Sequence, residues 1–150
     1  RVYDGQYLVI EARLAGGKVP GPLAIEEPVS EARRRVVAFA SAVEARLAEL
    51  RRALDDWQGR GKRVVLWGSG SKAVAYLTGL GVGPEVLAVI DINPHKAGKY
   101  LAGTGHRIEA PEALARLRPD VVLVMNPVYR AEIARSLAAM GLAPSVHVLG

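Results

Sequence analysis

Three short polar segments of the chain carry side chains that could bind a charged ligand. In the first segment, Gly68, Gly70 and Ala73 follow the pattern G-x-G-x-x-A, in which small residues allow a tight turn and a close approach of the backbone to a phosphate. Lys72 adds a positive charge within reach of such a phosphate. The pattern predicts a nucleotide-binding turn, whose contact residues would be Gly68, Ser69, Gly70, Ser71 and Lys72.

The second segment starts at Asp91. Its distance from the glycine turn is that of an acidic residue that bonds a ribose hydroxyl in dinucleotide sites, but the same carboxylate could instead cap the turn at Asn93 and Pro94. The sequence leaves both roles open. The further candidate contacts of this segment are Asn93, Pro94, Lys96, Thr104 and His106.

The third segment contains Asn126, Tyr129 and Arg130. It offers an amide, a phenol that could stack on a ligand ring, and a guanidinium suited to bidentate contact with a phosphate. Tyr129 and Arg130 could equally do no more than start a helix. We include all three as candidate substrate or nucleotide contacts.

No catalytic residue and no metal site are predicted. The chain has no cysteine, and its histidines, His95, His106 and His147, lack the spacing of metal ligands. No serine, cysteine or paired carboxylate stands at a spacing that would make His95 or His106 an acid–base catalyst. The pattern G-x-x-x-x-G-K-[ST] is also absent, which disfavours phosphoryl transfer from a triphosphate.

Apolar runs and helical patterns alternate around these segments and predict the elements that position them. Strands are expected at 64–67, 86–90, 121–125 and 146–149, and helices at 73–80, 111–117 and 131–140. Continuous apolar strands that alternate with helices predict an α/β fold, a small doubly wound parallel sheet of the Rossmann-like type. The carboxyl ends of parallel strands form the ligand crevice of such a sheet, so the three polar segments should meet there.

The first third of the chain has a different pattern. Residues 1–28 are expected to hold a strand at 6–12 and a linker rich in proline and glycine, residues 29–58 one long helix, and residues 59–150 the Rossmann-like domain. The helix has an apolar stripe at a/d spacing from Val36 to Trp57. This stripe could pack on the α/β domain, on a neighbouring domain, or on a second copy of the helix in a homodimer.

Composition excludes two classes of partner. The net charge of +5 comes from arginines interleaved with acidic residues, and few aromatic residues are present, so no nucleic-acid surface is predicted. No apolar run approaches the roughly 20 residues that cross a membrane, and no secretory leader is recognisable. We therefore expect a cytoplasmic protein that binds a small molecule.

Three stretches together resemble the C-terminal domain of sugar C-methyltransferases. They are 62–72, 89–104 and 119–129, and the most specific of them reads D-x-N-P-x-K-x-G-x-Y-x-x-G-T from Asp91 to Thr104. Ala97 departs from the glutamine expected within it. In that family a zinc-binding domain and an S-adenosylmethionine domain precede a Rossmann-like domain that helps to hold a nucleotide-linked sugar.

The resemblance implies that residues 7–12 are the tail of a preceding methyltransferase domain, that the long helix is a bridge, and that the donor S-adenosylmethionine binds outside this chain. An acid-x-G-x-G methionine-donor motif is absent, because Trp67 precedes Gly68. The expected function is therefore a substrate-binding module that is not catalytic alone and holds no cofactor itself. The alternative is the NAD(P)-binding domain of an oxidoreductase.

Overall fold

The structure, a computed structural model, describes Tyr7, residues 9–12, Leu14, Gly16, Gly21 and residues 26–149. The chain divides into two compact units, Arg1–Phe39 and Ala40–Gly150. Of the strand expected at 6–12, Tyr7 is a single bridge residue and 9–12 have no regular secondary structure, while the other two positions lie outside the described residues. The described parts of the expected linker also have no helix or strand before Val29.

The long helix is confirmed. Helix α1 runs from Val29 to Gly59 without a break. Glu31 lies in its first turn, where a negative charge is favourable, and it pairs with Arg34 and Arg35 one turn further along. Leu50 and Leu54, in the second half of the helix, belong to the second unit and are buried in its core.

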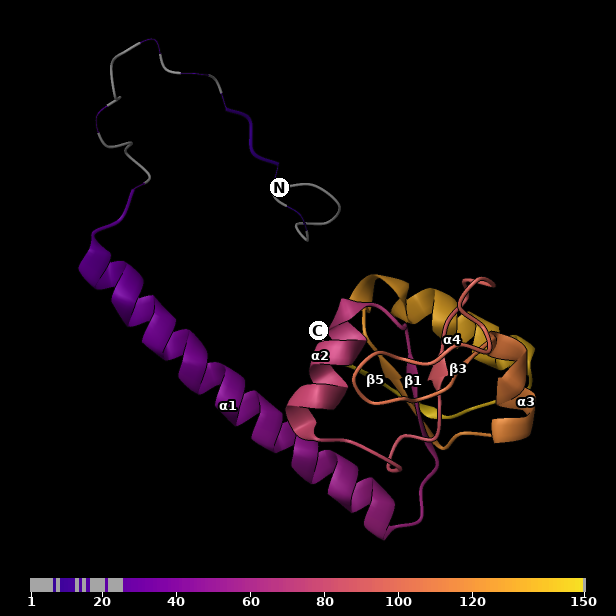
Figure 1. Ribbon diagram of the computed structural model, residues 1–150. Coiled ribbons are helices and arrows are strands. Elements are labelled where there is room, and N and C mark those ends of the chain that lie inside the picture. Colours follow the sequence, from indigo (N-terminus) through magenta and orange to yellow (C-terminus); the bar gives the residue numbers. More distant parts are fainter. Residues whose placement is uncertain are drawn as a thin grey trace. The chain divides into compact units, whose positions relative to one another are not determined.

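The second unit is a five-stranded parallel sheet with the strand order β3-β2-β1-β4-β5. The strands are β1 (Val64–Trp67), β2 (Val89–Ile90), β3 (Ile108–Glu109), β4 (Val121–Val124) and β5 (Ser145–Val148), and the helices that follow α1 are α2 (Ser71–Leu80), α3 (Leu114–Leu117) and α4 (Arg130–Ala139). Two short 3-10 turns, η1 (Pro111–Ala113) and η2 (Pro127–Tyr129), lead into α3 and α4. This arrangement confirms the predicted Rossmann-like sheet (Figure 1).

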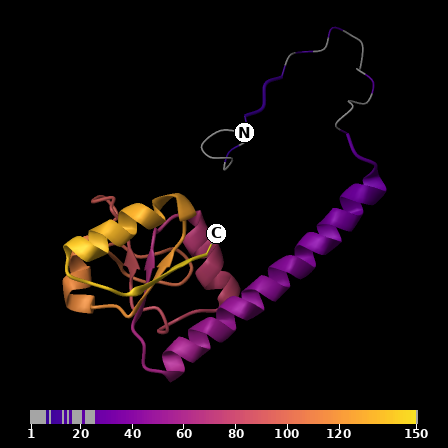
Figure 2. The same ribbon diagram turned by 180° about the vertical axis from the view of Figure 1, so that it is seen from behind.

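Helices cover both faces of the sheet because every residue of the central strands is apolar. Alternate residues point to opposite faces: Val64 and Leu66 pack with α2 and the second half of α1, whereas Val65 and Trp67 pack with α3 and α4. Figures 1 and 2 show the sheet between α2 on one side and α3 with α4 on the other. The two cores are separated only by the sheet.

Two predictions about the strands need correction. The strand expected at 86–90 is shorter, since only Val89 and Ile90 form β2, although Leu87 and Ala88 still bond to β1 through their backbones. The sequence analysis also missed β3, which lies at the edge beside β2. The remaining helices and strands agree with the prediction to within about two residues, a margin within which helix and strand ends vary with the assignment method.

Among the described residues, no helix combines the length and apolar character needed to cross a membrane.

Candidate functional site

The glycine turn lies at the carboxyl end of the central strand, where the strand order reverses. β1 pairs with β2 on one side and with β4 on the other, so the turn after β1 is the switch point of the sheet. Gly68 has a φ of 110°, which a residue with a side chain rarely adopts, and an added Cβ would lie 3.4 Å from the Cβ of Met125. Glycine therefore lets the turn pass close to the end of β4.

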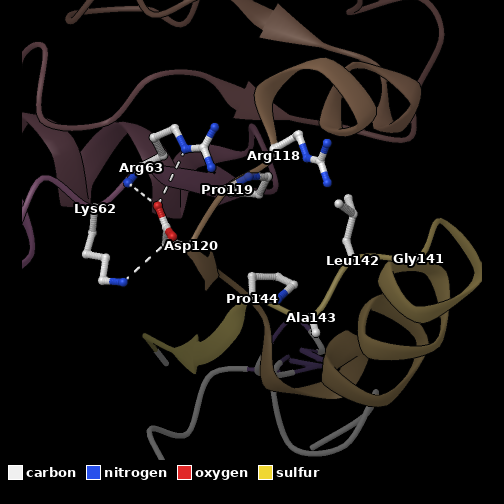
Figure 3. A pocket seen from close by; sticks show the side chains of 9 residues that line it. All are labelled: Lys62, Arg63, Arg118, Pro119, Asp120, Gly141, Leu142, Ala143 and Pro144. Carbon is white, nitrogen blue, oxygen red and sulfur yellow. Dashed lines mark hydrogen bonds and ion pairs between the residues drawn. The ribbon is translucent and has the colours of Figure 1, made fainter.

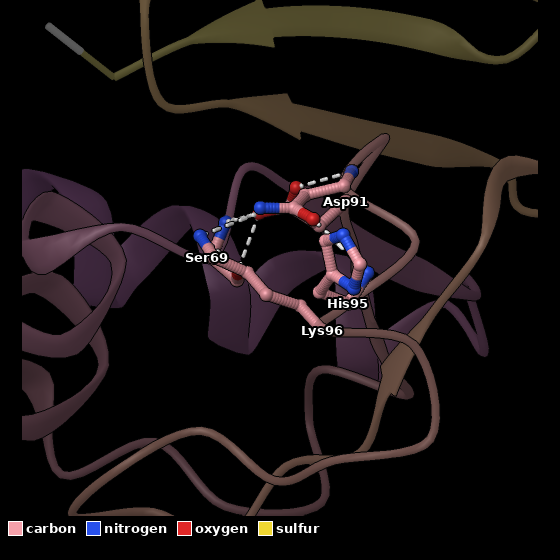
Figure 4. A network of polar contacts seen from close by, with 5 residues as sticks. Ser69, Asp91, His95 and Lys96 are labelled. Atoms are coloured by element: carbon pink, nitrogen blue, oxygen red, sulfur yellow. Dashed lines mark hydrogen bonds and ion pairs between the residues drawn. The ribbon is translucent and has the colours of Figure 1, made fainter.

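Asp91 holds this turn from the end of β2. Its Oδ2 accepts the backbone N–H of Ser69 at 3.0 Å and also a short hydrogen bond from the Ser69 hydroxyl. The Lys96 ammonium donates to the same carboxylate oxygen at 3.3 Å and to the Ser69 oxygen at 3.1 Å. Figure 4 shows the three side chains meeting at one point.

The other oxygen of Asp91 caps the turn that follows. Asp91 Oδ1 accepts the backbone N–H of Asn93 at 2.9 Å, and the Asn93 side-chain oxygen accepts the N–H of His95 at 3.0 Å. These are local bonds typical of Asx turns. The capping role that the sequence left open for Asp91 is thus present in the structure, and His95 is held through its backbone.

The ionisation of Asp91 follows from these contacts. Burial by itself raises the pKa of the carboxyl, but the hydrogen bonds from Ser69, Asn93 and Lys96 together outweigh that effect, so the pKa lies below its usual value. Asp91 is therefore ionised at neutral pH. The Lys96 ammonium, 3.3 Å from Oδ2, offsets its charge.

The start of α2 offers hydrogen-bond donors with no acceptor. Gly70 is the N-cap and supplies no side-chain cap. The backbone N–H groups of Gly70, Ser71 and Lys72 have no partner among the described residues. Since the helix dipole is positive at this end and Lys72 is exposed beside it, the local field favours an anion.

The third polar segment lies next to the glycine turn, as predicted. Met125 at the end of β4 bonds through its N–H to the Trp67 carbonyl, which brings Asn126 to the same edge of the sheet. The Asn126 side-chain oxygen caps η2 by accepting the N–H of Val128. Tyr129 and Arg130 follow on the exposed surface at the start of α4.

Thr104 and His106 are not brought to this edge. His106 lies two residues before β3, at the amino end of the sheet, and its ring bridges the Gly83 carbonyl and the Thr104 hydroxyl at 2.8 Å each. Because a carbonyl can only accept, the nitrogen Nε2 donates to Gly83, and in the neutral ring Nδ1 accepts from the Thr104 hydroxyl. The two residues join two loops instead of facing the glycine turn.

A separate hollow of about 340 Å³ opens at the amino edge of the sheet. It is lined by Lys62, Arg63, Arg118, Pro119, Asp120 and residues 141–144 (Figure 3). Asp120 pairs with Lys62 and Arg63, and the negative carboxyl ends of α3 and α4 point to this edge. Asp120 thus offsets part of the positive charge of the lining, and no predicted site residue lines the hollow.

No group of three histidine, aspartate or glutamate side chains that could hold a metal ion occurs in the part of the chain that the structure describes. The candidate site at the carboxyl edge thus offers backbone donors, the cations Lys72, Lys96 and Arg130, and one carboxylate that already accepts four hydrogen bonds. It is suited to binding an anionic group and provides no paired acid and base.

The fold and this site define a Rossmann-like α/β domain with a glycine turn that leads from its first strand into a helix. A family model described as the C-methyltransferase C-terminal domain matches residues 23–145. The chain belongs to this family, which confirms the resemblance found in the sequence. A search for similar curated proteins found no match.

Two solved structures are reported as similar to this chain. UDP-D-quinovosamine 4-dehydrogenase from Vibrio fischeri is 27% identical, with a TM-score of 0.45 over 58% of this chain and 76% of that one. The Rex-family repressor RSP is 20% identical, with a TM-score of 0.42 over 67% of this chain. This chain covers 59% of the repressor's length.

Proposed function

We propose that this chain is the substrate-binding module of an S-adenosylmethionine-dependent C-methyltransferase, and that it holds a nucleotide-linked sugar or a similar phosphorylated small molecule. Membership of the C-methyltransferase C-terminal domain family supports the methyltransferase context. The binding role rests on one observation, the three unpartnered backbone donors from Gly70 to Lys72 at the carboxyl edge.

A diphosphate matches these donors in chemistry. Its oxygens only accept hydrogen bonds, and the helix start offers only donors. Lys72 adds an exposed ammonium group. Lys96 uses two of its three N–H donors on Ser69 and Asp91, so one N–H stays available to a ligand. Asn126, Tyr129 and Arg130 would contact the rest of the ligand from the neighbouring strand end.

We place the methyl donor outside this chain. In the acid-x-G-x-G motif an acidic residue precedes the first glycine, and here that position is the buried Trp67. The nearest acid, Asp91, already accepts four hydrogen bonds from the chain. The described residues therefore do not fit S-adenosylmethionine, which we propose binds in a preceding methyltransferase domain.

Calorimetric titration tests this function directly. UDP and dTDP should bind the chain, S-adenosylmethionine should not, and Lys72→Ala should weaken UDP binding by about two- to fivefold, the range of an exposed ion pair. Lys62→Ala at the opposite edge is the matched control and should leave the affinity unchanged. Absence of heat with every diphosphate would contradict the proposal, and tight binding of NAD alone would favour an oxidoreductase domain.

The first half of α1 supports a second, separate proposal. Val36, Val37 and Phe39 are each more than 60% exposed, although apolar residues of this size rarely gather on a free helix. We propose that they contact another protein surface, either the preceding methyltransferase domain or a second copy of this helix. Light scattering separates the two: a dimer that Phe39→Glu dissociates indicates self-association, and a monomer rules it out.

A further inference from the structure

Asp91 occupies the sequence position at which an acidic residue bonds the ribose in dinucleotide sites. Most acceptor positions of its carboxylate, however, are already occupied by hydrogen-bond donors of this chain. Oδ2 accepts three donors, namely the Ser69 N–H, the Ser69 hydroxyl and the Lys96 ammonium. Oδ1 accepts the Asn93 N–H. A carboxylate has about four acceptor positions, usually two on each oxygen, so Oδ2 accepts one bond more than usual and Oδ1 one fewer.

Binding both hydroxyls of a ribose requires two acceptor positions on the carboxylate, which is more than Asp91 still offers. The two ribose hydroxyls donate two hydrogen bonds, and a single acceptor position remains on Oδ1. The side chain is also only 11% exposed, since Lys96 and the glycine turn cover it. To reach a ribose, Asp91 would have to release Ser69 or Asn93, and a buried donor left without an acceptor costs about 1–3 kcal/mol.

The ion pair between Lys96 and Asp91 also changes the electrostatic environment that a bound anion would experience. An uncompensated carboxylate next to the start of α2 would repel a phosphate. Because Lys96 lies 3.3 Å from Asp91, the pair is neutral as a unit, and the charges that remain at the edge are the positive ones of Lys72, Arg130 and the start of α2. The groups left over at the edge of β1 and β2 are therefore donors for an anion.

We propose that Asp91 is a positioning residue that fixes Ser69 and the glycine turn, and that the site recognises the diphosphate of its ligand without reading the ribose hydroxyls. Ribonucleoside and deoxyribonucleoside diphosphates are then equivalent ligands. The inference rests on the proposed function, because it specifies which part of the nucleotide is recognised at the same site.

Calorimetric titration with UDP, 2′-deoxy-UDP and 2′,3′-dideoxy-UDP tests the inference. The three affinities should agree within about threefold, because one fully used ribose hydrogen bond to a charged group would be worth roughly tenfold or more. Asp91→Asn should leave the ratio of UDP to dideoxy-UDP affinity unchanged. Asp120→Asn is the matched control, since Asp120 accepts a backbone N–H from Arg63 at the opposite edge.

A second readout reports on the positioning role without any ligand. The amide proton signals of Ser69 and Asn93 should shift together as Asp91 is protonated at acid pH, and saturating UDP should leave both bonds in place at neutral pH. A UDP preference of tenfold or more in the native chain would overturn the inference alone. Absence of binding by all three diphosphates and by pyrophosphate would overturn the proposed function and this inference with it.

Discussion

Asp91 at the end of β2 accepts both the backbone N–H and the hydroxyl of Ser69, so the strand beside β1 fixes the turn that leaves β1. This relationship links the fold to the site. It orients the start of α2, whose first N–H groups have no partner among the described residues and lie at the switch point of the sheet. A change at Asp91 should therefore affect stability as well as the geometry of the turn.

Asp91→Asn should lower the free energy of unfolding by about 1–3 kcal/mol at pH 7, because Ser69 and Lys96 lose a charged acceptor. The pKa of Asp91 is lowered in the folded chain, so its contribution is present above the unfolded pKa of about 4 and is lost as the pH falls through the folded pKa. Urea unfolding should show the difference between the two proteins shrinking below pH 4.

The control for that measurement is Asp56→Asn. Asp56 forms an exposed i,i+4 pair with Arg60, which is worth about 0.3–0.5 kcal/mol at most. An equal loss of unfolding free energy in both variants would show that the hydrogen bonds of Asp91 contribute no more to stability than an exposed ion pair does.

His106→Ala should destabilise the domain by about 1–2 kcal/mol, since the ring joins the Gly83 carbonyl to Thr104 and both bonds are lost. The affinity for UDP should stay the same, because His106 lies at the amino end of the sheet. His95→Ala is the comparison, since its ring is exposed and should be dispensable for stability. Loss of UDP affinity in His106→Ala, measured while it is folded, would restore the role predicted from the sequence.

Tyr76→Phe should leave the chain as stable as before or stabilise it by up to about 1 kcal/mol. The Tyr76 hydroxyl is buried and has no hydrogen-bond partner among the described residues, so removing it costs no bond. Burial raises the pKa of Tyr76 to about 12. The native chain should therefore lose stability as the pH rises from about 10, where an unfolded tyrosine ionises, towards 12, and the variant should lack this loss.

Tyr100→Phe, at an exposed position, should leave the stability at pH 7 unchanged. Thermal unfolding of the native chain and of the two variants from pH 7 to 11 measures these differences in stability. A destabilisation of Tyr76→Phe at pH 7 by more than about 1 kcal/mol would mean that the hydroxyl is bonded in solution.

Gly103→Ala and Gly105→Ala form a matched pair on the loop before β3. Both glycines have positive φ values, 83° and 68°, so each alanine costs about 1–2 kcal/mol of backbone strain. Only at Gly103 would the new Cβ lie 2.8 Å from the Thr78 methyl, which is held because the Thr78 hydroxyl bonds to the Val74 carbonyl. Urea unfolding should rank Gly103→Ala as the more damaging change, and equal losses would refute that contact.

The sequence was sufficient to predict the central sheet. β1 and β4 are continuous apolar runs, each followed by a polar turn, and this pattern is typical of strands buried on both faces. The edge strand β3 could not be predicted, because two residues, Ile108 and Glu109, carry no periodicity. Its parallel pairing with β2 comes from the loop that returns the chain to the amino end of the sheet.

The return of this loop to the amino end of the sheet also explains why some predicted site residues lie away from the others. Asp91, Asn93 and Lys96 stay at the carboxyl end of β2, whereas Thr104 and His106 are late enough in the same loop to have reached the other end. Residues of a single sequence motif thus lie at opposite edges of the sheet. The four hydrogen bonds that Asp91 accepts depend in part on the rotamers of the Ser69 and Lys96 side chains, which no spacing pattern encodes.

The central claim is that an anionic ligand binds at the start of α2, and amide chemical-shift mapping tests it most directly. On addition of UDP to the isotope-labelled chain, the largest shifts are predicted at Gly70, Ser71 and Lys72, with little change at Arg63 and Arg118 across the sheet. Shifts confined to the amino edge, or none at millimolar UDP, would contradict the account.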